Sequence, residues 1–507
     1  MTFFGDMLDN ETSQIGRIHE FARRLSGIAI VAADITDKDI PDDMEGLVAS
    51  TISFLEKSKE VKVIDARLLK DILGKQNDKA PEKIDVSRSA ELSIKAKDID
   101  TDFQIKHVSA EHTQGDTDAF VEYFNDRFAR LRKVINESGR NGKYVLTDIS
   151  RIKQYSDGRE VTITGMVNNK IITKNGNILV TLEDATDSAK VLFMKQSGRD
   201  QNIFDTGARI AYDDVIAVTG KISGPFVIAN GVMYPDIPIR TRKQTEEDFA
   251  IAFLSDVHVG SKRFLEKSFI EMLKWANGGT ERRKDLLSKL KYIVISGDVV
   301  DGIGVYPNQD KDLGILDIYK QYSNFFDLIK EIPDYIEIFV LPGNHDAVQL
   351  AEPQPPMAND IIGDFRQDNV HIISNPCYIR IHELNVLAYH GASLDPIIQY
   401  IPGCSYAKPE TAMIETLKRR HLSPIYGGNE IVPSKQDNMV MTEVPDILHM
   451  GHIHKNGYAD YHGTLVVNSG TWQDRTDYQI KHGHIPSPAI MPIYETKLQK
   501  ITEINFA

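Results

Sequence analysis

The chain has 507 residues and a formal net charge of −14. This length suggests about three domains. The negative charge argues against a protein that binds duplex DNA with its whole surface, because such binding requires neutralisation of the phosphates. Its two cysteines, Cys377 and Cys404, form neither a disulfide framework nor a zinc motif. No segment reaches the about 20 apolar residues of a membrane helix, and the N-terminus does not look like a signal peptide, so we expect a soluble cytoplasmic protein without membrane contact.

The first 119 residues contain two regions of different composition. Residues 1–74 carry apolar side chains at helical spacing, for example Leu47 and Leu68, and this pattern predicts a small N-terminal helical domain. Residues 75–119 have Phe103 as their single Phe, Tyr or Trp, among many Lys, Asp, Glu and Ser residues. Such a composition predicts a flexible linker. We therefore expect residues 1–119 to be dispensable for the body of the protein.

The next region changes from helix to strand periodicity. An apolar stripe that begins at Phe120 predicts a connecting helix over residues 120–143. Residues 144–245 instead show short alternating runs and a hairpin signal at Asn175-Gly176, which predict a barrel of the OB-fold type. The predicted strands are 161–164, 178–182, 190–194 and 215–222. They carry few aromatic residues, which favours a structural or partner-docking barrel over a platform for single strands.

Five short segments in residues 246–507 each place candidate metal ligands directly after an apolar, strand-like run. These segments are Asp256-Val257-His258, Gly297-Asp298-Val299-Val300-Asp301, Gly343-Asn344-His345-Asp346, Tyr389-His390-Gly391 and Gly451-His452-Ile453-His454. Open α/β sheets bind ligands at the edge where their strands end. The five segments therefore predict an α/β domain with its ligands gathered at one edge, although each segment alone also fits an ordinary loop.

The residue types fit a pair of divalent cations. Two cations about 3.5–4 Å apart can hold the oxygens of a phosphoryl displacement, but they repel each other unless an anion lies between them, and Asp298 is the expected bridge. Asp256 and His258 should point to the same side of an extended segment and share one ion. His452 and His454 repeat this spacing, and we assign one of them to each ion.

The remaining polar residues complete the predicted site. Asn344 offers an amide oxygen and His390 an imidazole nitrogen, a mixed set that suits manganese first, with iron, zinc or magnesium as alternatives. His345 should point away from the ion that Asn344 binds, and a histidine can protonate a leaving alkoxide near neutral pH, so we expect His345 to be the catalytic acid. Asp301 and Asp346 are expected to orient His345 and the bridging loop.

The series D-x-H, G-D-x-x-D, G-N-H-D, H-G and G-H-x-H resembles the calcineurin-like metallophosphoesterase superfamily. Flanking segments are also similar to the small subunits of archaeal family D DNA polymerases. These segments are Tyr306-Pro307-Asn308-Gln309, 343–347 with 351–355, 418–427 and Val444-Pro445-Asp446-Ile447. The resemblance implies a multi-domain α/β (α+β) chain: a metallophosphoesterase β-sandwich flanked by helices, preceded by the barrel and the helical domain.

The same resemblance implies a function. It implies a 3′–5′ exonuclease that proofreads single-stranded or primer-end DNA within a nucleoid-associated heteromeric polymerase. Synthesis would reside in the large catalytic subunit, since the chain has no Gly-x-x-x-x-Gly-Lys loop. Two alternatives stay open. One is a non-catalytic scaffold subunit, against which the intact ligand set argues, and the other is a phosphatase of the same superfamily.

Overall fold

The computed structural model describes residues 93–109, 115–139, 145–195 and 201–507, together with the pairs 30–31, 47–48, 51–52 and 63–64. The chain divides into two units, Met1–Asp85 and Val86–Ala507. In the first unit, β1 (Ile30–Val31) pairs in parallel with β2 (Val63–Ile64). Nearly all of the predicted helical domain, residues 1–74, lies outside the described residues.

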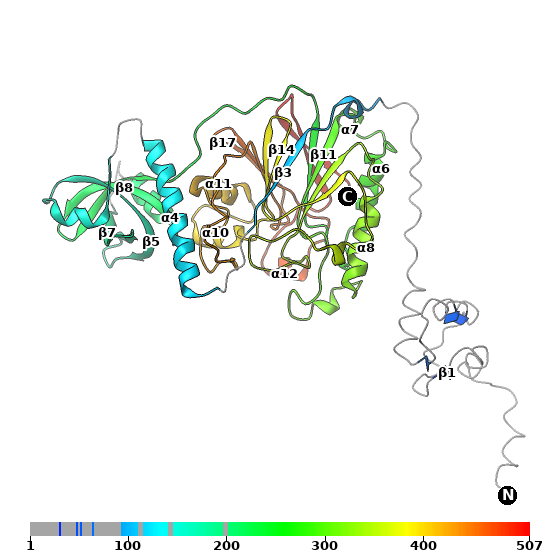
Figure 1. Cartoon of the computed structure of the whole chain (residues 1–507), viewed down its shortest axis with the longest axis horizontal. Helices are drawn as coiled ribbons and strands as arrows, with labels where there is room; N and C mark the ends of the chain where they lie inside the picture. Colours follow the sequence, from blue (N-terminus) through cyan, green and yellow to red (C-terminus); the bar gives the residue numbers. More distant parts are fainter. Residues whose placement is uncertain are drawn as a thin grey trace, which may run out of the picture. The chain divides into compact units, whose positions relative to one another are not determined.

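Two six-stranded sheets form the body of the second unit (Figure 1). The strands of the first sheet, in spatial order, are β13 (Val370–Ile372), β12 (Glu337–Leu341), β11 (Leu290–Ser296), β10 (Ala250–Leu254), β19 (Ile490–Glu495) and β20 (Lys500–Asn505). Those of the second sheet are β17 (Gly457–Tyr461), β18 (Thr464–Asn468), β16 (Ile447–Met450), β15 (Leu384–Ala388), β14 (Cys377–Ile381) and β3 (Phe103–His107).

The main hydrophobic core lies between these two sheets. Phe253 and Val294 of the first sheet share one buried cluster with Ile379, Val386 and Val467 of the second. Every residue of β10 and β11 is buried, as expected for parallel strands that are covered on both faces. The chain is therefore a mixed α/β structure, as predicted.

Helices cover the outer faces of the body (Figure 1). Figure 1 shows α6 (Glu266–Ala276) and α8 (Ile318–Ile329) on the side of the first sheet and α10 (Leu394–Tyr400) and α11 (Glu410–Arg419) on the side of the second. Short helices complete the body: α7 (Lys284–Leu287), α9 (Asn359–Ile362) and α12 (Asp477–Lys481). None of the helices in the described ranges is both long and apolar enough to cross a bilayer.

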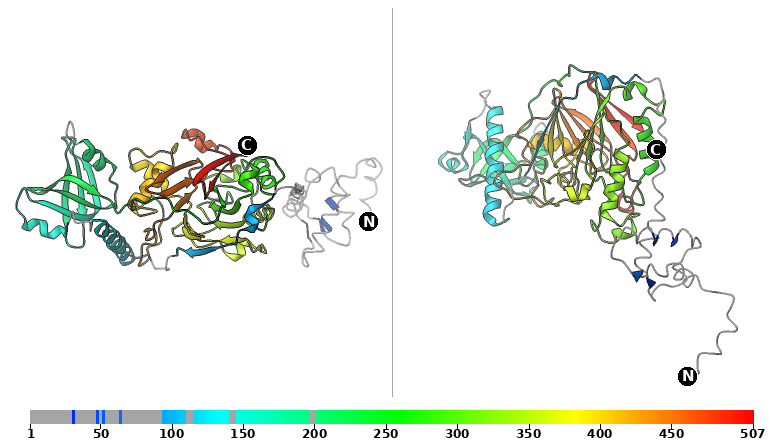
Figure 2. Two further views of the ribbon diagram at one scale, coloured as in Figure 1. Left: turned by 90° about the horizontal axis from the view of Figure 1, so that it is seen from above. Right: turned by 45° about the vertical axis from the view of Figure 1, so that its right-hand side comes forward.

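Residues 145–233 contain a barrel of five main strands (Figure 2). They are β5 (Glu160–Ile172), β6 (Ile178–Glu183), β7 (Ser188–Phe193), β8 (Val215–Ser223) and β9 (Phe226–Met233), with the short β4 (Leu146–Thr147) at one side and α5 (Gln201–Arg209) before β8. β5 pairs with both β6 and β8, which closes the barrel. The predicted strands are confirmed, and Gly176 turns the β5–β6 hairpin at a φ of 77°, where glycine is unstrained.

The prediction of a flexible linker over residues 75–119 is wrong for the part of this range that the structure describes. Lys95–Asp98 form a 3₁₀ turn, and β3 pairs antiparallel with β14 along all of its length. The Phe103 ring packs on Phe339 with centroids 5.1 Å apart. The polar composition led to a wrong prediction because an edge strand needs only one apolar face. Phe103 and Ile105 pack on the core, whereas their neighbours in β3 are exposed.

Helix α4 (Thr117–Gly139), close to the predicted connecting helix, is fixed to the body by a buried ion pair. The Arg127 side chain is 1% exposed and donates to Asp437 at 2.6 Å and to the Pro424 carbonyl at 3.0 Å. Asp437 also contacts Nε2 of His421 at 2.8 Å, while Nδ1 of His421 accepts the Ser423 amide. His421 is therefore neutral, in agreement with a pKa that burial lowers to about 4.

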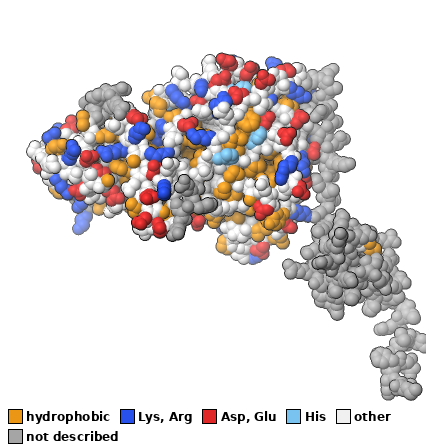
Figure 3. All heavy atoms as spheres, viewed as in Figure 1, with side chains coloured by type: hydrophobic (Ala, Val, Ile, Leu, Met, Phe, Trp, Pro, Cys, Tyr) orange, Lys and Arg blue, Asp and Glu red, His pale blue; other side chains and the backbone are white. Residues whose placement is uncertain are grey.

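A second buried ion pair joins the body to the barrel. Arg419, in the last turn of α11, donates to Asp214 at 2.7 Å, directly before β8. Glu415 accepts from both Arg419 and Arg209. Elsewhere, charged side chains of both signs are interspersed on the face shown in Figure 3, so the net charge of −14 does not gather into one acidic patch on that face.

The strand β3 makes a prediction about truncation. A chain that starts at residue 93 should keep the stability of the body, because the described contacts of the second unit are all retained. A chain that starts at residue 120 should unfold more easily, since it loses the strand partner of β14 and the apolar contacts of Phe103 and Ile105, worth roughly 3 kcal/mol or more. Thermal unfolding midpoints of the two truncated chains would test this, and equal midpoints would contradict it.

The buried pair of α4 makes a second prediction. Arg127→Met should lower the free energy of unfolding by about 3–5 kcal/mol, because Asp437 would remain buried without its cation. Arg132→Met on the same helix is the matched control. Its partner Asp148 has a side chain that is 33% exposed, so the expected loss is at most about 1 kcal/mol. Urea titration would measure both, and similar losses would refute a special role for Arg127.

Candidate metal centre

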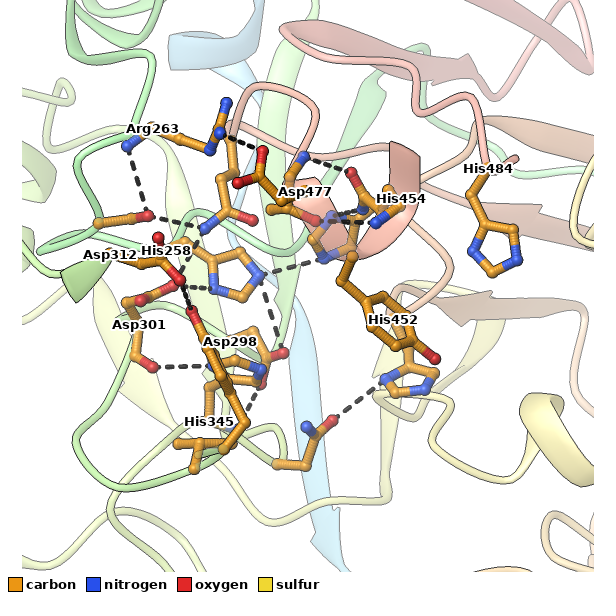
Figure 4. A pocket seen from close by; sticks show the side chains of 18 of the residues that line it. His258, Arg263, Asp298, Asp301, Asp312, His345, His452, His454, Asp477 and His484 are labelled. Atoms are coloured by element: carbon orange, nitrogen blue, oxygen red, sulfur yellow. Dashed lines mark hydrogen bonds and ion pairs between the residues drawn. The ribbon is translucent and has the colours of Figure 1, made fainter. Parts of the chain in front are cut away.

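The five predicted ligand segments lie where strands of both sheets end. Asp256 and Asp298 follow β10 and β11, and Asn344 follows β12. His390 follows β15, and His452 follows β16. All five segments turn toward the same region, and Figure 4 shows His258, Asp298, Asp301, His345, His452 and His454 around one pocket. The predicted gathering of these side chains is therefore observed, with both sheets contributing.

The backbone at several of these residues is left-handed. The φ angles are 53° at Asp256, 53° at His258, 51° at Asp298, 68° at His452 and 57° at His454. Our expectation that Asp256 and His258 lie on an extended segment is wrong, although both side chains reach the site. Left-handed backbone costs a non-glycine residue about 1 kcal/mol or more and persists only where the surrounding structure enforces it.

One group of potential ligand atoms comes from Asp256, His258 and His454. These atoms all lie within 4.8 Å of one another. The Nε2 atoms of His258 and His454 are 3.1 Å apart, and Nε2 of His454 lies 3.3 Å from Asp256. Two imidazole nitrogens and a carboxylate thus face a common point, an arrangement that suits a divalent cation.

A second group surrounds the other side of Asp298. Asp256, Asp298 and His390 place their ligand atoms within 4.8 Å of one another. The Asn344 amide oxygen lies 2.9 Å from Nε2 of His390 and 3.1 Å from Nδ1 of His452. The Asp298 carboxylate lies 3.4 Å from His390 of its own group and 3.9 Å from His258 of the first group, while Asp256 belongs to both groups.

The pKa values of two histidines show that the site favours positive charge. Burial lowers the pKa of His258, but Asp301, Asp298 and Asp256 outweigh this effect and raise it to about 9. In the same way, burial opposes and the carboxylates, Asp298 first, raise the pKa of His390 to about 10. Buried carboxylates that draw protons onto nearby imidazoles are equally suited to draw cations. The donor set therefore fits two divalent cations.

The outer nitrogens of the histidines are also held in place. Asp301 contacts Nδ1 of His258 at 3.0 Å, and the Ser296 carbonyl contacts Nδ1 of His390 at 2.9 Å. Asp395 on α10 contacts Nε2 of His452 at 3.0 Å, and Gln479 on α12 contacts Nδ1 of His454 at 2.9 Å. Such partners fix the orientation of metal-binding imidazoles. No spacing in the sequence predicted Asp395 or Gln479.

His345 belongs to neither of these two groups, although its ring lies next to that of His258, with centroids 4.8 Å apart. Its Nδ1 donates to the Asp301 carbonyl at 2.8 Å, and its backbone amide donates to Asp298 at 2.8 Å. The ring borders the pocket, so Nε2 is left for a molecule bound there. Burial lowers the pKa of His345 from its usual value. Because His345 also forms a group with His258 and Asp301 whose ligand atoms lie within 4.8 Å, its role as acid rather than ligand stays a prediction.

The two predicted supporting carboxylates differ in position. The Asp301 carboxylate orients His258, and only its carbonyl contacts His345. Asp346 accepts from the Gly343 amide at 2.8 Å and from the Val299 amide at 3.3 Å, so it joins the two loops that carry Asn344 and Asp298. Burial, followed by the charge of Asp298, raises the pKa of Asp346 to about 7.

Comparison with known proteins identifies the family. The family model for the B subunits of DNA polymerases alpha and epsilon matches residues 251–458. The DNA polymerase II small subunit of Methanocaldococcus jannaschii is 41% identical over 420 residues, covering 81% of this chain and 70% of that protein. That of Archaeoglobus fulgidus is 42% identical over 384 residues, covering 75% and 76%. That of Pyrococcus horikoshii is 36% identical over 438 residues, covering 83% and 69%. The chain therefore belongs to the family of archaeal DNA polymerase II small subunits.

Proposed function

We propose that this chain is the 3′–5′ exonuclease of a heteromeric archaeal replicative polymerase, and that it removes nucleotides from single-stranded or mispaired DNA ends. The observation that carries the proposal is the convergence of two buried carboxylates, four imidazoles and one amide oxygen at the ends of five strands. A small subunit implies a large partner, and we assign DNA synthesis to that partner.

The proposed site holds two divalent cations, with manganese as the first choice. Asp256, His258 and His454 would hold one cation. Asn344, His390 and His452 would hold the other, and Asp298 would be shared between them. Cations at these positions supply Lewis acidity toward a phosphoryl group. The mixed nitrogen and oxygen ligands support manganese, iron or zinc more than magnesium.

The side chains around the cations would position the scissile bond and move the proton. His345 is fixed by the Asp301 carbonyl at Nδ1, so in its imidazolium form, with a second proton on Nε2, it would give that second proton to the departing sugar oxygen. Asp346 holds the loops of Asp298 and Asn344 at a constant separation. His258, His390 and His452 keep their orientation through Asp301, Ser296 and Asp395.

The body and the barrel support more specific assignments within this proposal. We assign the two packed sheets with outer helices to the calcineurin-like metallophosphoesterase fold. We assign the closed barrel to the OB-fold, acting as a structural or docking module near the nucleoid-bound polymerase. The buried Arg419–Asp214 pair suits this role, because it ties the barrel to the body.

Two other functions remain as alternatives with distinct expectations. A scaffold subunit without catalysis would have no need of an intact ligand set, and the close approach of the candidate side chains supports an enzyme instead. A phosphatase would use the same cations, but the family membership favours a DNA substrate. Digestion of DNA separates the proposed enzyme from both alternatives, because only that enzyme shortens DNA.

The shared position of Asp298 makes a prediction about metal content. Asp298→Ala should lose both cations, because the remaining ligands cannot screen the repulsion between two divalent charges. Asp312→Asn is the matched control. Asp312 borders the same pocket but belongs to neither ligand group, so this variant should keep both cations. Elemental analysis would measure occupancy, and full occupancy in Asp298→Ala would rule out the shared position.

The role of His345 makes a prediction about rate. The full chain with its large subunit should shorten an end-labelled single strand from its 3′ end when manganese is added. His345→Ala should keep its metals and its affinity for DNA, while cleavage slows by about 10²- to 10⁴-fold, as is usual when a general acid is lost. His390→Ala should instead lose metal. Loss of metal in His345→Ala would place His345 among the ligands, and failure of the wild-type complex to cleave DNA would refute the nuclease.

A further inference from the structure

One side of the metal pocket is lined by aromatic rings that take no part in the ligand groups. The pocket has a volume of about 560 Å³, and Tyr406, Tyr478 and His484 line it. The rings of Tyr406 and His484 are stacked, with centroids 4.1 Å apart and an interplanar angle of 28°. Tyr478 meets His484 edge to face at 6.4 Å and 78°. We call these three residues the aromatic wall. Figure 4 shows His484 beside the labelled histidines of the site.

The aromatic wall is open to solvent at its outer end. Tyr478 lies on α12 and is 65% exposed, and a second histidine, His482, packs against it with centroids 4.1 Å apart. A single exposed tyrosine is ordinary on a protein surface. A row of contacting aromatic rings that continues from the surface into the pocket is not explained by cation binding, which needs only the carboxylates, the imidazoles and the amide oxygen.

Each tyrosine of the aromatic wall is tied to a predicted metal ligand. Tyr406 interacts with the Asp395 carboxylate, which in turn contacts His452 at 3.0 Å. The residue after Tyr478 is Gln479, which contacts His454 at 2.9 Å. A capping box formed by Thr476 and Gln479 fixes the start of α12. The Tyr406 side chain and the helix that carries Tyr478 are therefore held in place before any ligand binds, which lowers the entropic cost of binding.

A cationic side chain borders the same pocket. Arg263 lines it and contacts Asp477 at 2.7 Å, with both side chains partly or largely exposed. Aromatic rings that line the same pocket as a guanidinium and a candidate cation site match a nucleotide, which combines a planar base with a phosphate. A phosphorylated side chain of a protein would use the cations and the guanidinium but would have no need of the wall.

We propose that the aromatic wall is a stacking subsite for the unpaired terminal base of the DNA strand that the metal centre cleaves. This inference rests on the proposed nuclease function and extends it to the choice of substrate. A base inside a duplex has both faces covered by neighbouring bases, and the base of a paired end is held by its partner strand, so an unpaired end can lay its base on Tyr406 or Tyr478 without the cost of opening a pair. The wall thus selects frayed or mispaired ends over paired ones by stacking, whatever the base sequence.

The test uses the full chain with its large subunit and a single strand that carries 2-aminopurine at its 3′ end, in EDTA so that no cleavage occurs. Stacking on the wall should quench the fluorescence. Tyr478→Leu and Tyr406→Leu should each weaken binding of this strand about 5- to 150-fold, the range for loss of one base–aromatic stack. Tyr478→Phe keeps the aromatic ring and should bind the strand as tightly as the unchanged protein. Tyr319→Leu is the control, because Tyr319 is exposed on α8 and lies outside the pocket.

A second probe needs no variant. A strand whose 3′ terminal position lacks a base should bind the wild-type complex as weakly as the normal strand binds Tyr478→Leu. Equal affinity for the normal and abasic strands, or unchanged quenching in both leucine variants, would overturn the stacking subsite. Quenching only when the 2-aminopurine is moved to the 5′ end would also overturn it. If the base effects hold but manganese brings no cleavage, the subsite stands and the nuclease function fails.

Discussion

The structure holds two buried carboxylates close together, although like charges repel each other and burial removes both from water. Asp256 is 0% and Asp298 2% exposed, and their ligand atoms lie within 4.8 Å of each other. At an effective dielectric of about 20, such like charges repel by roughly 3 kcal/mol, and burial adds the cost of removing both from water. Both carboxylates accept backbone hydrogen bonds, Asp256 from His452 and Asp298 from His345. The surrounding imidazoles and the cations we propose would compensate the remaining charge.

The position of these carboxylates depends on the two packed sheets. Asp256 and Asp298 follow neighbouring parallel strands of one sheet, while His390 and His452 follow neighbouring parallel strands of the other. Left-handed backbone at Asp256 and Asp298 turns the chain sharply as it leaves each strand. A core that is fully buried on both faces of β10 and β11 can hold such strained residues, whereas a surface loop would relax to a more favourable conformation.

The gathering of the candidate ligands could be predicted from the sequence, because each of these residues follows a recognisable apolar strand. Other features had no such local signal. Asp395 and Gln479 act on His452 and His454 from helices whose placement depends on tertiary packing. β3 was hidden by its polar composition, since only Phe103 and Ile105 face the core. The left-handed backbone at Asp256 and His258 was also missed, because residue alternation in an extended strand does not describe what happens after the strand ends.

Because of strand β3, the two-sheet body is built from two separate segments of the chain, one before the barrel and one after it. β3 comes before α4 and the barrel, yet its partner β14 begins at Cys377, long after the barrel strands are complete. During synthesis, α4 and the barrel can close while β3 still lacks its partner, and domains generally fold as units while the chain grows. The ribosome must therefore release most of the protein before β3 can pair. Until then, its open edge is a site where chaperones or another nascent chain can bind.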